Sequence, residues 1–156
     1  MLKTFATICI IGMFTSSCTS KKASRTEGSH EAEQDLTMIV GTYTSGDSKG
    51  LYSFRFNEEN GTATALSEAE VENPSYLVPS ADGKFIYAVS EFSNEQAAAN
   101  AFAFNKEEGT FRLLNTQKTG GEDPCYIITN GSNVVTANYS GGSISVFPID
   151  KDGSLL

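Results

Sequence analysis

Four pairs of adjacent polar residues could supply acid–base chemistry in this chain of 156 residues. Each pair stands at the start or the end of a segment rich in strand-forming residues. The pairs are Glu72-Asn73, Ser90-Glu91, Glu122-Asp123 and Asn138-Tyr139. A carboxylate can take a proton from water as a general base, and amide or phenol groups can donate hydrogen bonds to a developing negative charge. These pairs can act together only if the fold brings them to one place.

Histidine and cysteine chemistry is not expected in the folded part of the chain. The only histidine, His30, lies in a polar N-terminal stretch, so no Ser-His-Asp triad can be assembled from the folded residues. Cys9 and Cys18 lie near the N-terminus, and Cys125 stands alone in a predicted strand, so neither a disulfide framework nor a zinc site is expected. We expect no cofactor and no metal. Acid–base chemistry must therefore use carboxylates, tyrosines or lysines.

The charge of the chain argues against nucleic acid as a partner. Lysine and arginine number 11 against 19 aspartates and glutamates, which gives a formal net charge of −8. Basic residues do not cluster on the part expected to fold, whereas nucleic-acid-binding domains carry a basic patch or stripe. We therefore expect no nucleic-acid partner.

The N-terminus has the features of a targeting segment. Lys3 precedes an apolar run over residues 5–14, which is too short to span a bilayer. Small residues then lead to Cys18, as in a bacterial lipoprotein signal; an ordinary secretory signal or an uncleaved anchor are the alternatives. We expect a signal peptide over residues 1–17, and a lipidated Cys18 with a flexible tether over residues 18–37. This predicts an exported lipoprotein of the bacterial cell envelope, facing the periplasm or the surface and attached to the membrane by its lipid.

The rest of the chain repeats itself. Residues 50–61 return as residues 98–109 and again, slightly shortened, as residues 142–153. Each copy ends in a glycine, and these glycines are 48 and then 44 residues apart. A period in this range is typical of a solenoid, a propeller or a repeat array.

Each repeat unit is predicted to hold four β-strands. The predicted strands are residues 75–80 and 125–130 for the first position, 38–43, 84–90 and 133–138 for the second, the repeated segments for the third, and 62–71 and 110–119 for the fourth. Only residues 94–99 resemble a helix, and they lie between two strands. Four strands per period of roughly 40–50 residues are typical of a propeller blade. We therefore predict an all-β fold of four-stranded antiparallel blades.

Strand direction then places the polar pairs. In a blade the chain runs in opposite directions along successive strands, so the loop entering the first strand and the loop leaving the second open on the same side. All four pairs fall in those loops. The sequence therefore predicts that they gather around one mouth of the propeller.

Three sets of residues carry a resemblance to a known family. They are Val40-Gly41-Thr42-Tyr43-Thr44 with residues 49–52, residues 73–77 with 81–91, and residues 120–125 with 137–143. In this order and spacing, over residues 38–156, they resemble the seven-bladed lactonases, the 6-phosphogluconolactonase-like β-propellers. The resemblance implies hydrolysis of a sugar lactone, typically the phosphorylated gluconolactone of the pentose phosphate route, and so a part in glucose metabolism. The family usually has a histidine where this chain has Tyr126.

Lactone hydrolysis assigns roles to the loop residues. Glu91 is the candidate general base, and Tyr126 is the second candidate catalytic residue, as a hydrogen-bond donor. Asn73, Asn138 and Tyr139 are the candidate substrate-binding residues. The alternative is that the loop carboxylates are merely solvated and that residues 73–74 and 123–124 only start turns.

Two and a fraction units cannot close a ring, so we expect residues 38–156 to be the first blades of a longer, seven-bladed protein. The predicted function is that of a sugar-lactone hydrolase in the complete form, with this fragment inactive by itself. The alternative is a non-catalytic exported propeller that binds glycan or protein at its mouth, because propellers host many functions.

Overall fold

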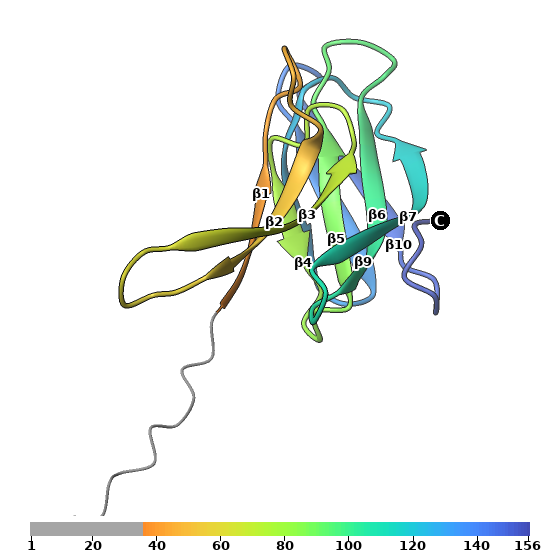
Figure 1. The fold of residues 1–156 in the computed structure, drawn as a ribbon. Helices are drawn as coiled ribbons and strands as arrows, with labels where there is room; N and C mark the ends of the chain where they lie inside the picture. Colours follow the sequence, from red (N-terminus) through yellow and green to blue (C-terminus); the bar gives the residue numbers. More distant parts are fainter. Residues whose placement is uncertain (1–35) are drawn as a thin grey trace, which may run out of the picture. The chain divides into compact units, whose positions relative to one another are not determined.

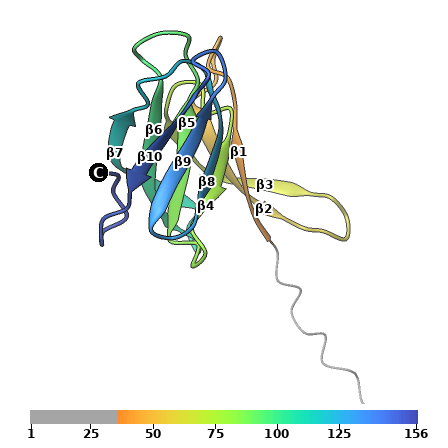
Figure 2. The same ribbon diagram turned by 180° about the vertical axis from the view of Figure 1, so that it is seen from behind.

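The computed structural model describes residues 36–156, which form ten β-strands and no helix. The strands are β1 (Leu36–Gly41), β2 (Gly50–Phe56), β3 (Ala63–Glu70), β4 (Leu77–Pro79), β5 (Phe85–Ser90), β6 (Ala98–Asn105), β7 (Thr110–Lys118), β8 (Pro124–Thr129), β9 (Asn133–Asn138) and β10 (Ser143–Pro148). Figures 1 and 2 show them from opposite sides. No helix among these residues could therefore cross a membrane.

The strands form three antiparallel sheets that match the predicted repeat units. The first sheet has the order β1-β2-β3, the middle sheet β4-β5-β6-β7, and the third sheet β10-β9-β8. Sheets of neighbouring units stack, because β3 lies beside β7 and β4 lies beside β8. The prediction of an all-β fold built of four-stranded antiparallel blades is confirmed, with the middle sheet as the complete blade.

The repeat extends to irregular details of the backbone. The pairing of β2 with β3 shifts register between Ser53 and Phe54, and the pairing of β6 with β7 shifts between Ala101 and Phe102. These two bulges fall at the same position of the repeat. A bulge bends its strand and increases the local twist, so the first and middle sheets receive the same curvature at the same place.

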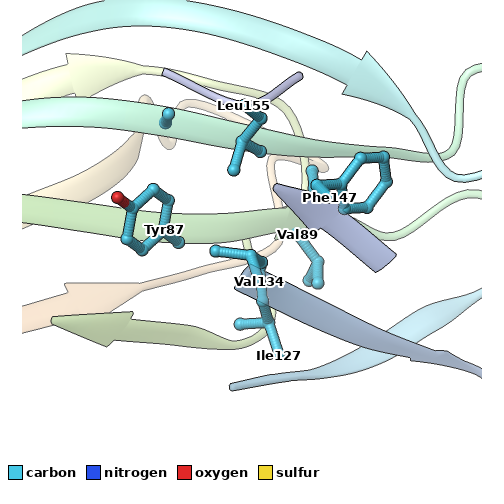
Figure 3. Packing of buried hydrophobic residues seen from close by; sticks show 8 residues of the cluster. Tyr87, Val89, Ile127, Val134, Phe147 and Leu155 are labelled. Carbon is cyan, nitrogen blue, oxygen red and sulfur yellow. The ribbon is translucent and has the colours of Figure 1, made fainter. Parts of the chain in front are cut away.

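Apolar residues on both faces of the middle sheet form two core clusters. One face contributes Tyr87, Val89, Ala99 and Ala101, which pack with residues of the third sheet such as Val134 (Figure 3). The other face contributes Ile86, Ala88, Phe102 and Phe104, which pack with Leu51 of the first sheet. Successive residues of a strand point to opposite faces, so a strand buried on both sides needs a continuous apolar run. Residues 86–89 are such a run.

Two of the three repeated glycines, Gly109 and Gly153, contact the preceding sheet. The carbonyl oxygen of Gly109, in the β6–β7 hairpin, accepts a hydrogen bond of 2.6 Å from Ser53 Oγ of the first sheet. The carbonyl oxygen of Gly153 accepts one of 3.2 Å from Tyr87 Oη of the middle sheet. Gly109 and Gly153 therefore join neighbouring sheets, in addition to allowing their turns.

The Gly109 contact leads to a test of packing between sheets. Gly109 has a φ of 72°, and a Cβ there would lie 2.7 Å from Leu66 Cβ. Gly61 has a φ of 73°, but a Cβ there would meet no atom within 4 Å. We expect Gly61→Ala to lower the free energy of unfolding by about 1–2 kcal/mol, the cost of holding alanine in a left-handed conformation. Gly109→Ala should lower it by at least about 1 kcal/mol more, because its Cβ also meets Leu66. Urea denaturation measures both losses of stability. Equal losses for the two variants would contradict the close contact between Gly109 and the first sheet.

Several boundaries differ from the predicted ones. Strand β1 begins at Leu36, two residues before the predicted start, and β4 covers only Leu77–Pro79 of the predicted residues 75–80. Residues 94–99 form a turn followed by the start of β6, and not a helix. The Asn94 side chain accepts a hydrogen bond from the Gln96 amide, an interaction typical of turns. Ala97–Ala99 are buried among the strands. The predicted signal peptide, His30 and Cys18 lie outside the described residues.

Candidate active site

A phenol and a carboxylate from neighbouring sheets meet beyond the ends of two strands. Tyr43 follows β1 of the first sheet, and Glu91 follows β5 of the middle sheet. Tyr43 Oη donates a hydrogen bond of 2.9 Å to Glu91 Oε2. Tyr43 is 56% exposed, so a small molecule can reach the pair from solvent. The candidate base therefore has a phenol partner that sequence reasoning did not assign.

The surroundings keep the Tyr43 phenol protonated. The pKa of Tyr43 is raised above its ordinary value, first by the hydrogen bond to Glu91, then by burial and by the negative charge of Glu91. The Ser75 hydroxyl acts in the opposite direction, and the charge of Asp123 adds a last, small upward contribution. At neutral pH Tyr43 is therefore a hydrogen-bond donor and not a base.

Asn73 joins the loops that carry these two residues. Its Oδ1 accepts hydrogen bonds from the amide and the hydroxyl of Thr44, at 3.1 and 3.0 Å. Its carbonyl oxygen accepts a bond of 3.0 Å from the Glu91 amide, and its Nδ2 donates one of 3.3 Å to the Glu91 carbonyl. We call this arrangement the Asn73 bridge. The bridge uses the side-chain amide that the sequence assigned to substrate binding.

The close approach at this point depends on Gly41, the last residue of β1. A Cβ at position 41 would lie only 2.0 Å from the carbonyl oxygen of Pro74. Glycine is therefore required for the loop of Asn73 to lie against the end of β1. The first sheet and the middle sheet meet here through backbone atoms.

Asp123 makes a similar bridge one sheet later. Its carbonyl oxygen accepts a hydrogen bond of 2.8 Å from the Tyr139 amide, and its Oδ1 accepts one of 2.6 Å from Ser93 Oγ. The hydroxyls of Ser140 and Ser93 lower the pKa of the Asp123 carboxyl. Asp123 therefore connects the middle sheet to the third sheet as a charged hydrogen-bond acceptor.

Tyr126 lies on β8 and contacts an aromatic partner. Its ring centroid is 4.8 Å from that of Tyr76, with the ring planes tilted by 53°. Both tyrosines are 42% exposed. Tyr76 is adjacent to β4, which lies beside β8, so the two rings form an exposed aromatic pair over the first strands of two neighbouring sheets. The catalytic role assigned to Tyr126 from the sequence stays a prediction.

The two remaining candidates lie in different environments. Asn138 is 2% exposed; its Oδ1 accepts from Thr136, and its Nδ2 donates to Ser143 and Ser145 at 3.1 and 2.9 Å. Its side chain thus connects strands β9 and β10, and its role in substrate binding stays a prediction. Tyr139 is 81% exposed and free to contact a ligand. The geometry gives Asn138 a structural part, and substrate binding by Tyr139 also stays a prediction.

The structure shows which signal could have found Tyr43. The predicted strand over residues 38–43 included it, whereas β1 ends at Gly41, so Tyr43 lies in the loop after the second strand. Glu91 follows the second strand of the next unit in the same way. Aligning the ends of these strands across the repeat would have placed the two residues in adjacent loops.

Stacked antiparallel sheets of three or four strands, with repeated bulges and polar residues in the loops at one end, define the chain as part of a β-propeller. The family model of the lactonases with a seven-bladed β-propeller matches residues 37–156. The chain belongs to this family, as its sequence motifs predicted.

The most informative relatives are bacterial lactonases. The 6-phosphogluconolactonase of Bacillus subtilis (strain 168) is 38% identical over 122 residues, covering 74% of this chain and 34% of the relative. That of Formosa agariphila is 34% identical over 125 residues, covering 76% and 35%. The chain thus spans about a third of the length of the curated relatives that it matches.

Solved structures agree with this assignment. A Bacteroides fragilis protein provisionally assigned as a 6-phosphogluconolactonase is 70% identical, with a TM-score of 0.79 over 81% of this chain and 35% of that chain. The periplasmic gluconolactonase of Pseudomonas aeruginosa is 30% identical, with a TM-score of 0.71 over 77% and 36%. The described residues therefore have the fold of one part of these larger propellers.

Proposed function

We propose that the complete protein containing this chain hydrolyses a sugar lactone in the manner of the 6-phosphogluconolactonases, with Glu91 as general base. The contact between Tyr43 and Glu91 is the observation that carries the proposal. It joins a hydrogen-bond donor and a proton acceptor in loops on the side where strand direction places the polar pairs. The names of the relatives supply the class of substrate.

The proposed proton transfers use water and the Glu91 carboxylate, which Tyr43 orients. Glu91 takes a proton from water through Oε1 while Tyr43 holds Oε2. The water oxygen forms a bond to the lactone carbonyl carbon, and the ring C–O bond then breaks. The proton on Glu91 passes to the ring oxygen, which leaves as a hydroxyl, and the product is an open-chain sugar acid. The Tyr43 phenol orients the carboxylate by donating its single proton to Oε2.

The test is hydrolysis of defined lactones by the complete protein. Glucono-δ-lactone and its 6-phosphate should be opened well above the uncatalysed rate, measured as acid release at constant pH. Absence of turnover with both lactones, in a protein shown to be folded, would contradict the proposal. Comparing the two values of kcat/KM gives the preference for the phosphate group.

The exposed aromatic pair of Tyr76 and Tyr126 favours a second candidate function, that of a propeller that binds glycan without catalysis. Exposed aromatic faces pack well against the apolar faces of sugar rings. Tyr126, one member of the pair, stands at the position where the family usually has a histidine. Tight binding of a sugar without any lactone turnover would favour this candidate over the hydrolase.

We further propose that the protein is an exported lipoprotein with a part in carbohydrate metabolism outside the cytoplasm. The support is Lys3, the apolar residues 5–14 and the small residues before Cys18. A phosphorylated intermediate of the cell interior is then a poor substrate candidate, and an unphosphorylated sugar lactone is a better one. Stable anchoring needs more than one acyl chain, as bacterial lipoproteins carry.

The location leads to a direct prediction for Cys18. In the native host, Cys18→Ala should release the protein from the membrane fraction or leave it unprocessed, because the acceptor of the lipid is gone. Membrane fractionation and intact mass measure both outcomes. Cys125→Ala is the matched control, since it removes an exposed cysteine of the folded part. The same membrane fraction and the same mass for Cys18→Ala and wild type would contradict the lipid anchor.

A further inference from the structure

The hydrogen bonds of the Asn73 bridge connect the two loops that carry Tyr43 and Glu91. One loop is held through the amide and the hydroxyl of Thr44, the residue directly after Tyr43. The other is held through the backbone of Glu91 itself, by its amide and its carbonyl. Asn73 thus fixes the backbone beside the phenol and the backbone of the carboxylate at once.

The backbone of Asn73 has an unusual conformation. Its φ is 46°, in the left-handed region, where side chains other than glycine, asparagine and aspartate are rare. The following residue is Pro74, and a residue before proline normally prefers an extended conformation. Such a conformation persists only where surrounding contacts impose it, and functional sites are enriched in such residues. Here those contacts are the hydrogen bonds of the bridge.

Comparing the Asn73 bridge with the bridge at Asp123 shows which features belong to the repeated fold and which belong to the proposed site. Asp123 has a φ of 52°, precedes Pro124, and joins the loop of Ser93 to the amide of Tyr139. Within residues 36–156, however, no phenol–carboxylate hydrogen bond links the two loops that it joins. A bridge before a proline is therefore a repeated device of this propeller, and only the one at Asn73 holds a reactive pair.

We propose that Asn73 is a positioning residue, which holds the Tyr43 phenol and the Glu91 carboxylate in contact across two blades and does not bind substrate itself. The predicted effect of Asn73 on catalysis rests on the proposed function. Its predicted effect on the contact between Tyr43 and Glu91 does not, because that contact involves no substrate. The substrate-binding role assigned to Asn73 from the sequence is replaced by this one.

The first test measures the contact without any substrate. Complete protein labelled with 13C at tyrosine Cζ is titrated by NMR, and the Tyr43 resonance is identified by its loss in Tyr43→Phe. Asn73→Gly keeps the left-handed backbone and removes the side-chain amide. The pKa of Tyr43 should fall toward the ordinary tyrosine value of about 10, because Glu91 no longer accepts the hydrogen bond of its phenol. Thr44→Val, which removes one hydrogen bond of the bridge, should move it less in the same direction.

The matched control is Asp123→Gly, which removes the corresponding bridge between the middle and third sheets. Most of the upward shift of Tyr43 should remain, since the charge of Asp123 is the smallest of its causes. An unchanged Tyr43 titration in Asn73→Gly would overturn the proposal. So would an equal downward shift in both glycine variants, which would indicate general loosening.

The second test distinguishes positioning from binding. With a lactone that the wild type opens, Asn73→Gly should lower kcat by about 100-fold and leave KM within about threefold, because misplacing a catalytic group costs rate. Asn73→Asp, which keeps the acceptor for Thr44, should recover part of kcat. A raised KM with unchanged kcat would show that Asn73 binds substrate. If no lactone is turned over, the proposed function fails, while the tyrosine titration still decides the role of Asn73.

Discussion

Glu91→Gln in the complete protein should lower kcat/KM for its lactone by about 10²–10⁴-fold, the range expected on loss of a general base. The amide keeps the size of the side chain and can still accept the hydrogen bond from Tyr43, but it cannot take a proton from water. The loss should appear in kcat, since the substituted group acts on water in the transition state. Initial rates over a range of lactone concentrations measure it.

The control is Glu95→Gln, in the same loop region, which removes an equal charge from an exposed position. It should change kcat/KM by less than about threefold, because an exposed charge in salt has little influence at a distance. A Glu91→Gln protein as active as this control would remove Glu91 from the mechanism. Turnover would then have to depend on other loop residues.

Phe102→Ala should destabilise the protein by about 3–5 kcal/mol, the cost typical of deleting a buried phenylalanine. Phe102 is 1% exposed and packs between the first and middle sheets, with its ring 6.3 Å from that of Phe111. Removing it leaves a cavity between the sheets that carry Tyr43 and Glu91. We therefore expect reduced lactone turnover as well as reduced stability. Urea denaturation and initial rates measure the two effects.

Leu113 provides a matched control for this loss. It is the cross-strand neighbour of Phe102 in the pairing of β6 with β7, yet it is 52% exposed. Leu113→Ala should cost no more than about 0.5 kcal/mol, as surface substitutions usually do. Similar losses for the two variants would show that the interface between the sheets is not the stabilising core.

The fold could be predicted well because its signals are local and repeated. The apolar run at residues 86–89 and the repeated hairpin glycines each set one strand or turn, and three copies support one another. Boundaries were less certain where tertiary contacts decide. Residues 94–99 resemble a helix in sequence, but Ala97–Ala99 are buried within the packed strands. Strand β4 is short because Asn73 and Pro74 hold the preceding segment in another conformation.

The site could be predicted only in part, because its central contact joins two repeat units. The sequence places Glu91 in the loop after a second strand, where the structure has it, but it assigns Tyr43 to the strand before its loop. Asn138 lies at a similar strand end, yet its side chain turns inward to Thr136 and Ser145. The end of a strand thus predicts which side of the blade a residue occupies, but packing decides whether its side chain faces solvent.

The most direct test of the account is a double-mutant cycle on lactone hydrolysis with Tyr43→Phe and Glu91→Gln in the complete protein. If the two residues act as one unit, the double variant should have the kcat/KM of Glu91→Gln alone, within about threefold. Tyr43→Phe alone should be impaired, because its partner loses the group that orients it. Losses that multiply, or a Tyr43→Phe protein as fast as the wild type, would contradict the claim that this contact between blades is the catalytic centre.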